Sequence, residues 1–400
     1  MNYIYQQAEW PRFSWQDAVM SKLLPDVHLR RGRLLGRMEE IGFDLQQEAN
    51  LRVLTQDVVK TSAIEGEILD PLSVRSSIGR RLGIDVAGAA PSSRSVDGVV
   101  EMLLDATRKC DAPMTAERLF TWHSGLFSER TPYNEKLTIG AWRPVEKDPM
   151  QVVSGAFGRE RIHFEAPSGS DVPNQMEGFI RWMNSSVNSD PVIRAAIAHL
   201  YFVTIHPFED GNGRISRALS DMALASGEKG APRFYSLSAQ IERERSDYYE
   251  MLERTQKGTT DITEWLDWFS SCCGRALTKA EAELDSVLKI SKTWAQINTH
   301  PVNERQKLIL NKLLNGFEGK LSSSKYATIA NCSEDTALRD IKELMAFGIV
   351  EAYPGGGRST RYRLAELPAV TKVTSLAPPN RDEPGTGGSA ATLPAASGGT

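Results

Sequence analysis

The sequence is poor in cysteine and has no long apolar run. Four cysteines occur among 400 residues, and none has the paired spacing of a zinc site. They are Cys110, Cys272, Cys273 and Cys332. A disulfide framework is therefore not expected, which indicates a reducing compartment. The most apolar stretch, residues 192–208, contains Arg194, His199 and His206, so it is too short and too polar to span a bilayer.

The sequence also lacks a secretory leader and an excess of either charge. The first residues, MNYIYQQAEWPRFSW, contain neither a basic region nor an apolar core, so no signal peptide is expected. Lys and Arg number 47 against 51 Asp and Glu, a net charge of −4, which excludes a chain-wide attraction to nucleic acid or anionic lipid. We expect a soluble cytoplasmic protein with no membrane partner.

Apolar residues recur at spacings of three and four from Ser14 to about Asn298, which predicts a mainly α-helical fold. One such stripe consists of Leu34, Leu35, Met38, Ile41 and Leu45. Residues 150–164 differ, because two short β-type runs flank a glycine-containing turn and predict a hairpin. From Pro301 the order is helix, helix, turn, helix and a glycine-tipped ribbon, the layout of a winged helix-turn-helix.

These patterns predict four regions. Residues 1–95 form an amino-terminal helical region, 96–299 a catalytic domain and 300–365 the winged helix-turn-helix domain. Residues 366–400 are rich in proline, glycine and small residues, so they are expected to be a disordered tail.

The densest chemical signal is residues 206–217, HPFEDGNGRISR. Pro207 disfavours helical geometry at His206, so the preceding helix should end near Ile205. The glycine-rich loop then leads into another helix, and free backbone N–H groups at a helix N-terminus form an anion site. Arg214 and Arg217 are three residues apart on one helix face, which suits a polyphosphate.

Two side chains in the same string suit catalysis. Asp210 is a hard oxygen ligand placed to hold Mg²⁺ against the phosphates. His206 is the neighbouring group whose ordinary pKa suits general-base work near neutrality. A surface loop with a capping Asp and solvated arginines is the plain alternative, but it does not explain all these residues within twelve positions.

The string matches the whole signature H-P-F-x-[DE]-G-N-G-R-x-x-R, so the chain resembles the Fic family. The resemblance implies transfer of AMP from ATP to a Ser, Thr or Tyr hydroxyl of a target protein, with release of pyrophosphate. It implies that His206 deprotonates the hydroxyl and that Asp210 binds Mg²⁺ or Mn²⁺. The implied ATP-binding residues in the string are Gly211, Asn212, Gly213, Arg214, Ser216 and Arg217. Arg217 would take the γ-phosphate, and Gly213 favours AMP transfer because Doc-type relatives, which transfer phosphate, carry Lys there.

Weaker resemblances lie outside the string. Gly140-Ala141-Trp142-Arg143 is similar to the G-x-[WY]-R stretch that leads into the Fic flap. The hairpin at 150–164 falls where that flap holds a target segment by strand addition. The residues implied to contact the target are Val152, Val153, Ser154 and Gly155.

Three further residues are implied to bind the nucleotide. Tyr248 and Tyr249 resemble the pair that lines the adenosine pocket, with packing in the core as the alternative. Gln256 stands where some relatives carry an Asn that contacts the nucleotide.

Residues 61–66, TSAIEG, resemble the inhibitory motif [ST]-x-x-x-E-[GN] of the family, with Thr61, Glu65 and Gly66 at its defined positions. A carboxylate can occupy the bidentate site that Arg217 offers to a γ-phosphate, so Glu65 would restrain the enzyme. A helix end at Gly66 is the structural alternative, and both readings can hold together. In some relatives the same Glu aligns a water that removes AMP from the target, so the reverse reaction stays open.

The carboxy-terminal module carries ten Lys and Arg against seven Asp and Glu over residues 301–364, a net charge of +3. Its predicted recognition helix presents Ser333, Thr336, Arg339 and Lys342, and its wing presents Arg358, Thr360 and Arg361. These residues could contact phosphates and base edges. Glu334, Asp335 and Asp340 on the same helix would repel phosphate. Dimerisation and protein docking are the alternatives to DNA binding.

Two hypotheses follow. In the first, the chain is a protein adenylyltransferase restrained by Glu65, acting on a target protein or on itself. In the second, it is a transcription regulator that senses nucleotide and binds DNA through the carboxy-terminal domain. Transfer of another nucleotide such as UMP stays open, as does a homodimer.

Overall fold

The computed structural model describes residues 3–365, apart from 87–88, 130, 132–133, 156–158, 160, 186–189, 229–230, 315–316, 318–319 and 355–359. The chain divides into two compact units, Met1–Ser286 and Val287–Thr400. The finer boundaries proposed from the sequence stay predictions. The predicted tail, 366–400, and the wing residue Arg358 lie outside the described residues. All four cysteines are free.

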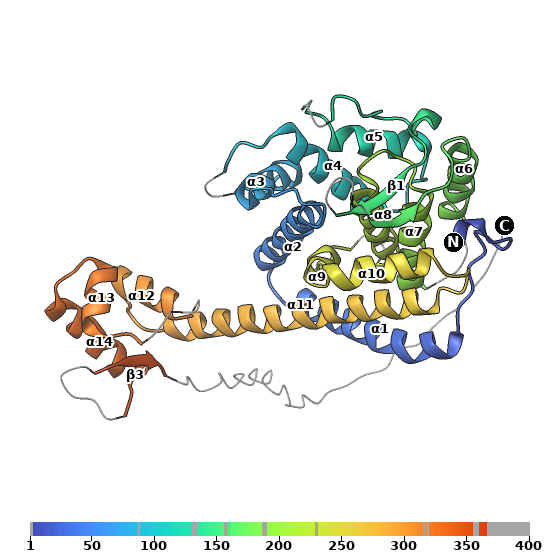
Figure 1. Ribbon diagram of the computed structural model, residues 1–400. Helices are drawn as coiled ribbons and strands as arrows, with labels where there is room; N and C mark the ends of the chain where they lie inside the picture. The colour runs from blue at the N-terminus through green and yellow to red at the C-terminus, as the bar shows by residue number, and fades with distance from the viewer. Residues whose placement is uncertain are drawn as a thin grey trace, which may run out of the picture. The chain divides into compact units, whose positions relative to one another are not determined.

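The first unit is mainly helical, as predicted (Figure 1). Its elements are η1 (Ile4–Gln6), α1 (Asp17–Glu39), α2 (Phe43–Ile64), α3 (Pro71–Leu82), α4 (Arg94–Arg108), α5 (Ala116–Leu126), η2 (Val145–Lys147), β1 (Gln151–Ser154), β2 (Arg161–Glu165), α6 (Val172–Met183), α7 (Pro191–Ile205), α8 (Asn212–Gly227), α9 (Leu237–Arg243), α10 (Arg245–Gln256) and α11 (Thr263–Ile297). The last of these continues past residue 286. None of the helices in the described part of the chain is both long enough and apolar enough to cross a membrane.

The apolar stripe from Leu34 to Leu45 does not form a single helix. α1 ends at Glu39, and α2 begins after Gly42, which is its N-cap residue. Leu34 is buried, whereas Leu45 is 37% exposed, so the two ends of the stripe do not share one core face. Gly42 has extended backbone angles (φ −61°, ψ 154°), and glycine is a poor helix former, so the helix does not continue through this position despite the apolar spacing.

The α7–α8 pair forms the centre of the first unit (Figure 1). α7 is buried on every side, as expected for a helix with so continuous an apolar sequence. It begins with Pro191 at its first helical position, and the Asp190 carboxylate accepts a hydrogen bond from the backbone N–H of Val192 at 2.8 Å. Trp265 of α11 donates through Nε1 to the backbone oxygen of Ala196 at 2.8 Å, which fixes the far side of α7.

Two glycines let α4 and α5 approach each other closely. A Cβ added at Gly98 would lie 2.0 Å from the backbone oxygen of Gly125, so the backbones are in direct contact there. This contact matters for the site, because α5 carries the buried His123 toward the loop that precedes α8.

The predicted hairpin is present. β1 pairs antiparallel with β2, and the register shifts between Val152 and Val153. Phe164 of β2 is buried and packs edge-on against Tyr3 and Tyr5. The hairpin therefore rests on the amino-terminal segment and not on its own two strands alone.

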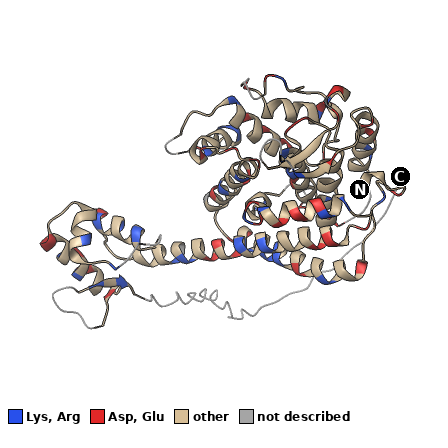
Figure 2. Ribbon diagram, viewed as in Figure 1, with Lys and Arg blue, Asp and Glu red and all other residues tan. Residues whose placement is uncertain are grey.

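Charged residues of both signs line α1 and the part of α11 that lies beside it (Figures 1 and 2). Arg37 of α1 pairs with Asp285 at 2.5 Å, and Arg30 lies 3.6 Å from Glu281. Arg52 of α2 reaches Glu283 at 2.8 Å. These partly exposed pairs between distant segments each contribute on the order of 1 kcal/mol.

The second unit contains α12 (Glu304–Leu314), α13 (Ser323–Ala330), α14 (Glu334–Ala346) and the antiparallel strands β3 (Val350–Ala352) and β4 (Tyr362–Leu364). Its own core is formed around residues such as Leu310, Tyr326 and Ile341. This order of helices and hairpin agrees with the layout expected from the sequence, and its assignment as a winged helix-turn-helix stays a prediction.

One expectation for α14 is wrong. Asp340 is buried instead of facing outward with Glu334 and Asp335. It accepts hydrogen bonds from Nε of Arg305 at 2.9 Å and from the Tyr326 hydroxyl at 3.0 Å. Its charge is therefore compensated inside the unit and does not oppose a phosphate at the surface of α14.

Candidate functional site

The turn between α7 and α8 depends on two left-handed residues. α7 ends at Ile205, as Pro207 predicts, and His206 follows with φ 52° while its N–H still donates to Phe202 O at 3.1 Å. Gly211 has φ 82°, and α8 begins at the next residue. A Cβ at Gly211 would lie 3.1 Å from Cδ1 of Leu126, so both backbone angle and space favour glycine.

His206 is partly buried and its tautomer follows from its contact. Nδ1 lies 3.3 Å from the backbone oxygen of Val203, and a carbonyl oxygen only accepts, so Nδ1 carries the proton. The neutral ring then has its basic lone pair on Nε2. Burial lowers the pKa of His206 to about 4, so the imidazole is neutral near pH 7 and able to accept a proton.

Arg143 holds the carbonyl of His206. Its buried guanidinium donates through Nε to His206 O at 2.8 Å, through Nη1 to Asp148 at 2.7 Å and through Nη2 to Pro167 O. The sequence indicated this arginine only as part of the lead into the flap. The structure shows that it connects the flap region to the turn that carries His206.

His123 of α5 was not identified from the sequence, and it packs against the loop between α7 and α8. Its ring stacks on Phe208 with centroids 4.1 Å apart, and Nε2 donates to Asp210 O at 3.2 Å. Nδ1 accepts from the N–H of Gly140 at 3.0 Å. Burial lowers the pKa of His123 to about 4, so it acts as a neutral support. A lone histidine in an apolar helix gives no signal of this kind.

Asn212 closes the loop on itself. Its Oδ1 accepts from the N–H of Phe208 at 3.1 Å, and its Nδ2 donates to the oxygen of the same residue at 2.8 Å. Ser216 is also buried, and its hydroxyl donates to Gly213 O at 2.8 Å. Both side chains thus stabilise the turn into α8 through backbone atoms.

Thr61 and Glu65 of the amino-terminal region lie against Arg217 of α8. The Arg217 side chain is buried and donates through Nη2 to the Glu65 carboxylate at 2.7 Å. It also donates through Nε to the Thr61 hydroxyl at 2.7 Å and through Nη2 to Thr61 O at 2.9 Å. The buried Nη1 has no hydrogen-bond partner among the described residues.

Glu65 fills the space above Gly213. A Cβ added at Gly213 would lie 2.1 Å from Oε1 of Glu65 and 3.2 Å from Nη1 of Arg217. The carboxylate therefore lies at the N-terminal turn of α8, where the helix dipole and free N–H groups favour an anion.

The three residues expected to bind the adenosine differ in their exposure to solvent. Tyr248 is buried, and its hydroxyl bonds His199 Nε2 at 2.8 Å, so it packs in the core behind Arg217. Tyr249 is 38% exposed and donates to Ile64 O at the end of α2 at 3.3 Å. Gln256 is buried and donates to Thr204 Oγ1 at 3.3 Å. Only Tyr249 presents a substantial exposed surface.

The expected flap residues lie on and just after β1. Val152 and Val153 are 36% and 48% exposed, and Gly155 ends the strand with φ 109°. The hairpin is attached to α10 through Glu253, whose carboxylate pairs with Arg161 at 2.9 Å and with His163 Nδ1 at 2.6 Å. The hairpin is thus linked to α10, the helix that carries the two tyrosines.

Asp210 is the one residue implied to hold a metal. Its Oδ1 accepts from the N–H of Gly211 at 2.5 Å, and its side chain is 30% exposed on the same side as Arg214, which lies 3.9 Å away. Among the residues that the structure describes, no cluster of three or more His, Cys, Asp or Glu side chains could hold a metal. Mg²⁺ commonly binds through one or two carboxylates together with substrate phosphates, so the single carboxylate fits such an ion.

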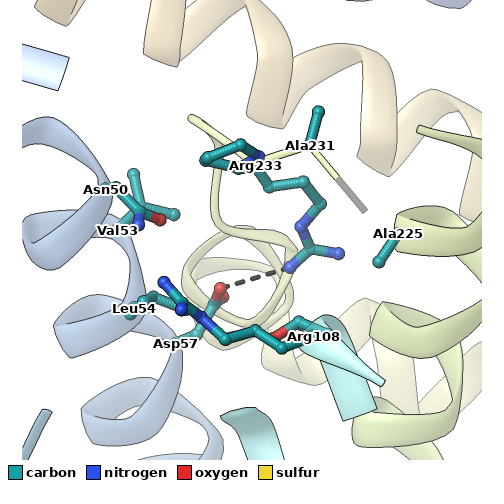
Figure 3. A pocket seen from close by; sticks show the side chains of 10 residues that line it. Asn50, Val53, Leu54, Asp57, Arg108, Ala225, Ala231 and Arg233 are labelled. Atoms are coloured by element: carbon teal, nitrogen blue, oxygen red, sulfur yellow. Dashed lines mark hydrogen bonds and ion pairs between the residues drawn. The ribbon is translucent and has the colours of Figure 1, made fainter. Parts of the chain in front are cut away.

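A cavity of about 360 Å³ lies elsewhere, between α2, α4, α8 and residues 231–233 (Figure 3). Arg233 points into its wall and pairs with Asp57 of α2 at 3.2 Å and with Asp221 of α8 at 2.7 Å. Burial and the nearby Asp221 raise the pKa of Asp57 to about 7. These buried contacts join α2, whose C-cap residue is Glu65, to α8, which carries Arg217. The sequence contains no sign of them, because a charged residue looks the same there whether it is buried with a partner or solvated.

Comparisons with known proteins agree with the resemblance. Residues 113–224 match the Fic/DOC family, and residues 3–84 match a domain of unknown function, DUF4172. A protein adenylyltransferase Fic of Drosophila ananassae is 29% identical over 229 residues, which cover 56% of this chain and 40% of that protein. The protein of the same name from Drosophila melanogaster is 35% identical over 135 residues, covering 32% of this chain and 25% of that protein. The chain therefore spans less than half the length of these relatives.

A solved structure shows the same fold. The Fic family protein from Desulfovibrio desulfuricans G20 has a TM-score of 0.50 and 19% sequence identity. The similarity covers 90% of this chain and 99% of that chain.

Proposed function

Because the chain carries a domain of the Fic family, we propose that it transfers AMP from ATP to a Ser, Thr or Tyr hydroxyl of a protein, releasing pyrophosphate. The observation that carries the proposal is the turn from His206 to Arg217, which brings a neutral imidazole, a carboxylate and two arginines to one helix N-terminus. The similarity to proteins named protein adenylyltransferase Fic supports the same reaction class.

In this reaction the hydroxyl oxygen attacks the α-phosphorus and the bond to the β-phosphate breaks. His206 Nε2 accepts the hydroxyl proton, for which its lone pair is suited because Nδ1 already donates to Val203 O. Arg214, Arg217 and the backbone at the start of α8 bind and orient the phosphates. Mg²⁺ or Mn²⁺ on Asp210 would supply positive charge next to the phosphates.

The proposal includes autoinhibition. The Glu65 carboxylate and the γ-phosphate of ATP would compete for the buried guanidinium of Arg217. The 2.7 Å contact between Glu65 and Arg217 supports a state in which the carboxylate occupies the γ-phosphate position and restrains the enzyme. The flap around Val152 and Val153 would hold the target as an added strand, which their exposure permits.

The test uses ATP labelled on the α-phosphate. Purified Glu65→Gly protein, incubated with cell lysate, should yield labelled protein bands that are absent when His206 is also replaced by Ala. ATP labelled on the γ-phosphate is the control, because AMP transfer leaves that label in pyrophosphate. Labelling from the γ-position alone would refute AMP transfer in favour of phosphate transfer. UTP labelled on its α-phosphate tests whether the site also accepts a nucleotide with a different nucleobase.

A DNA-binding regulator is the second candidate, and one observation favours it. Arg339 and Lys342 are exposed on α14, while the neighbouring Asp340 is buried and neutralised by Arg305. Salt-sensitive binding to one DNA sequence, lost in Arg339→Ala with Lys342→Ala, would support this role. No binding to a random-sequence DNA library at low salt would exclude it.

A further inference from the structure

The second arginine of the phosphate-binding helix also has a carboxylate partner. Arg214 Nη1 lies 3.0 Å from Oε2 of Glu67, and its guanidinium lies over the Phe127 ring at 5.2 Å from the centroid. The Arg214 side chain is 7% exposed and that of Glu67 is 37% exposed. In this pair the arginine side chain is thus buried, whereas the carboxylate side chain is accessible to solvent.

The end of α2 explains how two carboxylates reach two arginines. Gly66 has φ 85°, its N–H donates to Ala63 O at 3.0 Å, and the N–H of Glu67 donates to Ser62 O at 3.0 Å. These are the two hydrogen bonds of a Schellman motif, in which a left-handed glycine reverses the chain. Glu65 and Glu67 stand on either side of that glycine. Arg217 and Arg214 are three positions apart on one face of α8.

Each of the two arginines proposed to bind phosphate therefore pairs with a carboxylate at the end of α2. We propose that Glu67 is a second inhibitory residue, which occupies Arg214 as Glu65 occupies Arg217, so that a nucleotide polyphosphate must displace both. The inference rests on the proposed nucleotide site. It goes beyond the motif at residues 61–66, because Glu67 lies outside that motif and pairs with a different arginine.

The two carboxylates should affect different nucleotides. In the proposed site Arg217 takes the γ-phosphate, which ATP carries and ADP lacks. Arg214 lies one turn nearer the helix N-terminus, beside Asp210, and would bind phosphates that ATP and ADP share. Freeing Arg217 should therefore improve ATP binding more than ADP binding, whereas freeing Arg214 should improve both by similar factors.

Glu67→Gln is the variant of choice, because it keeps the size of the side chain, removes its charge and alters a partly exposed position. Glu242→Gln is the matched control. Glu242 of α9 pairs with Lys60 of α2 at 3.2 Å, and its side chain is 29% exposed, so its loss removes an ion pair of the same helix without touching either arginine.

The experiment measures the Kd of ATP and ADP by calorimetry with the full chain. Five proteins are compared: wild type, Glu65→Gly, Glu67→Gln, the double variant and Glu242→Gln. On the Glu65→Gly background, Glu67→Gln should lower the Kd of both ATP and ADP about threefold or more, which is the size of effect expected for a partly exposed ion pair. Glu242→Gln should leave both Kd values unchanged.

Two failures are distinguishable. If ATP binds neither Glu65→Gly nor the double variant, the proposed nucleotide site is wrong. If ATP binds Glu65→Gly but Glu67→Gln changes neither Kd on that background, the second inhibitory role is wrong and the first stands.

Discussion

Arg217 is bound to Thr61 by two hydrogen bonds, one to its hydroxyl at 2.7 Å and one to its backbone oxygen at 2.9 Å. These contacts do not involve the Glu65 carboxylate. Removal of that carboxylate would therefore leave the Arg217 side chain held by Thr61, while the guanidinium N–H group that now donates to Glu65 would become available to an incoming phosphate.

The first prediction follows from this anchoring. Glu65→Gly should raise the rate of AMP transfer at least about tenfold, since about 1.4 kcal/mol is less than a buried charge-assisted pair usually contributes. Initial rates with α-labelled ATP measure it. The double variant with Arg217→Ala should lose most of the gain, because in the proposed site the freed arginine is the group that binds the γ-phosphate. An unchanged rate in Glu65→Gly would mean that residues 61–66 only end a helix.

The second prediction concerns the base. His206→Ala on the Glu65→Gly background should lower the transfer rate by about 100- to 10,000-fold, because the hydroxyl keeps its proton. ATP affinity should stay within a few-fold, as the imidazole does not bind phosphate in the proposed site. Calorimetry and the labelling assay measure the two quantities separately. A variant that retains its rate would remove His206 from this role.

The third prediction is the pH dependence of transfer by Glu65→Gly. Burial lowers the pKa of His206 from its ordinary 6.5 to about 4, so the basic, neutral form persists as the pH falls below neutrality. The rate should therefore stay nearly constant from about pH 8 to about pH 5 and decline only toward pH 4. Circular dichroism at each pH checks that the fold persists. A decline centred near 6.5 would contradict the assigned environment of the ring.

The fourth prediction concerns Asp210. Transfer should require added Mg²⁺ or Mn²⁺, and Asp210→Asn should raise the metal concentration needed for half-maximal rate, because a neutral amide binds a divalent cation less well. The measurement is rate against metal concentration after removal of metals with a chelator. These rates are measured on the Glu65→Gly background, and full activity of Glu65→Gly in excess chelator would refute the assignment.

The fifth prediction concerns the buried bridge between α2 and α8. The pKa of Asp57 is raised to about 7 by burial and by the charge of Asp221, so the folded protein favours the protonated carboxyl. The stability that this group contributes is complete below its ordinary pKa of 3.8 and is lost as pH rises through 7. Asp57→Asn does not titrate, so its melting temperature relative to wild type should increase between those pH values by about 2 °C or more.

Thermal unfolding of both proteins at a series of pH values measures this difference. Asp111→Asn is a suitable control, because Asp111 lies in the loop after α4 and outside the bridge. A difference between wild type and Asp57→Asn that is constant with pH, or that decreases as pH rises, would contradict the protonated carboxyl.

Local signals in the sequence determined much of the site. Pro207 ended α7 at Ile205, and the glycine-rich loop led into α8, because both effects act through backbone angles of adjacent residues. The hairpin at 150–164 was likewise predictable from β-type runs around a turn. The spacing of Arg214 and Arg217 placed them on one face before any fold was known.

Only the tertiary structure decided which distant groups meet. Glu67 pairs with Arg214, His123 supports Asp210 and Arg233 joins Asp57 to Asp221, each across a long stretch of chain. Such pairs have no local spacing, and an ionisable residue looks the same in the sequence whether water or a buried partner compensates it. Burial, which packing of the whole chain creates, also lowers the pKa of His206. The sequence thus determined the chemical groups of the loop, and the packing of α2 against α8 decided which of them are held by carboxylates.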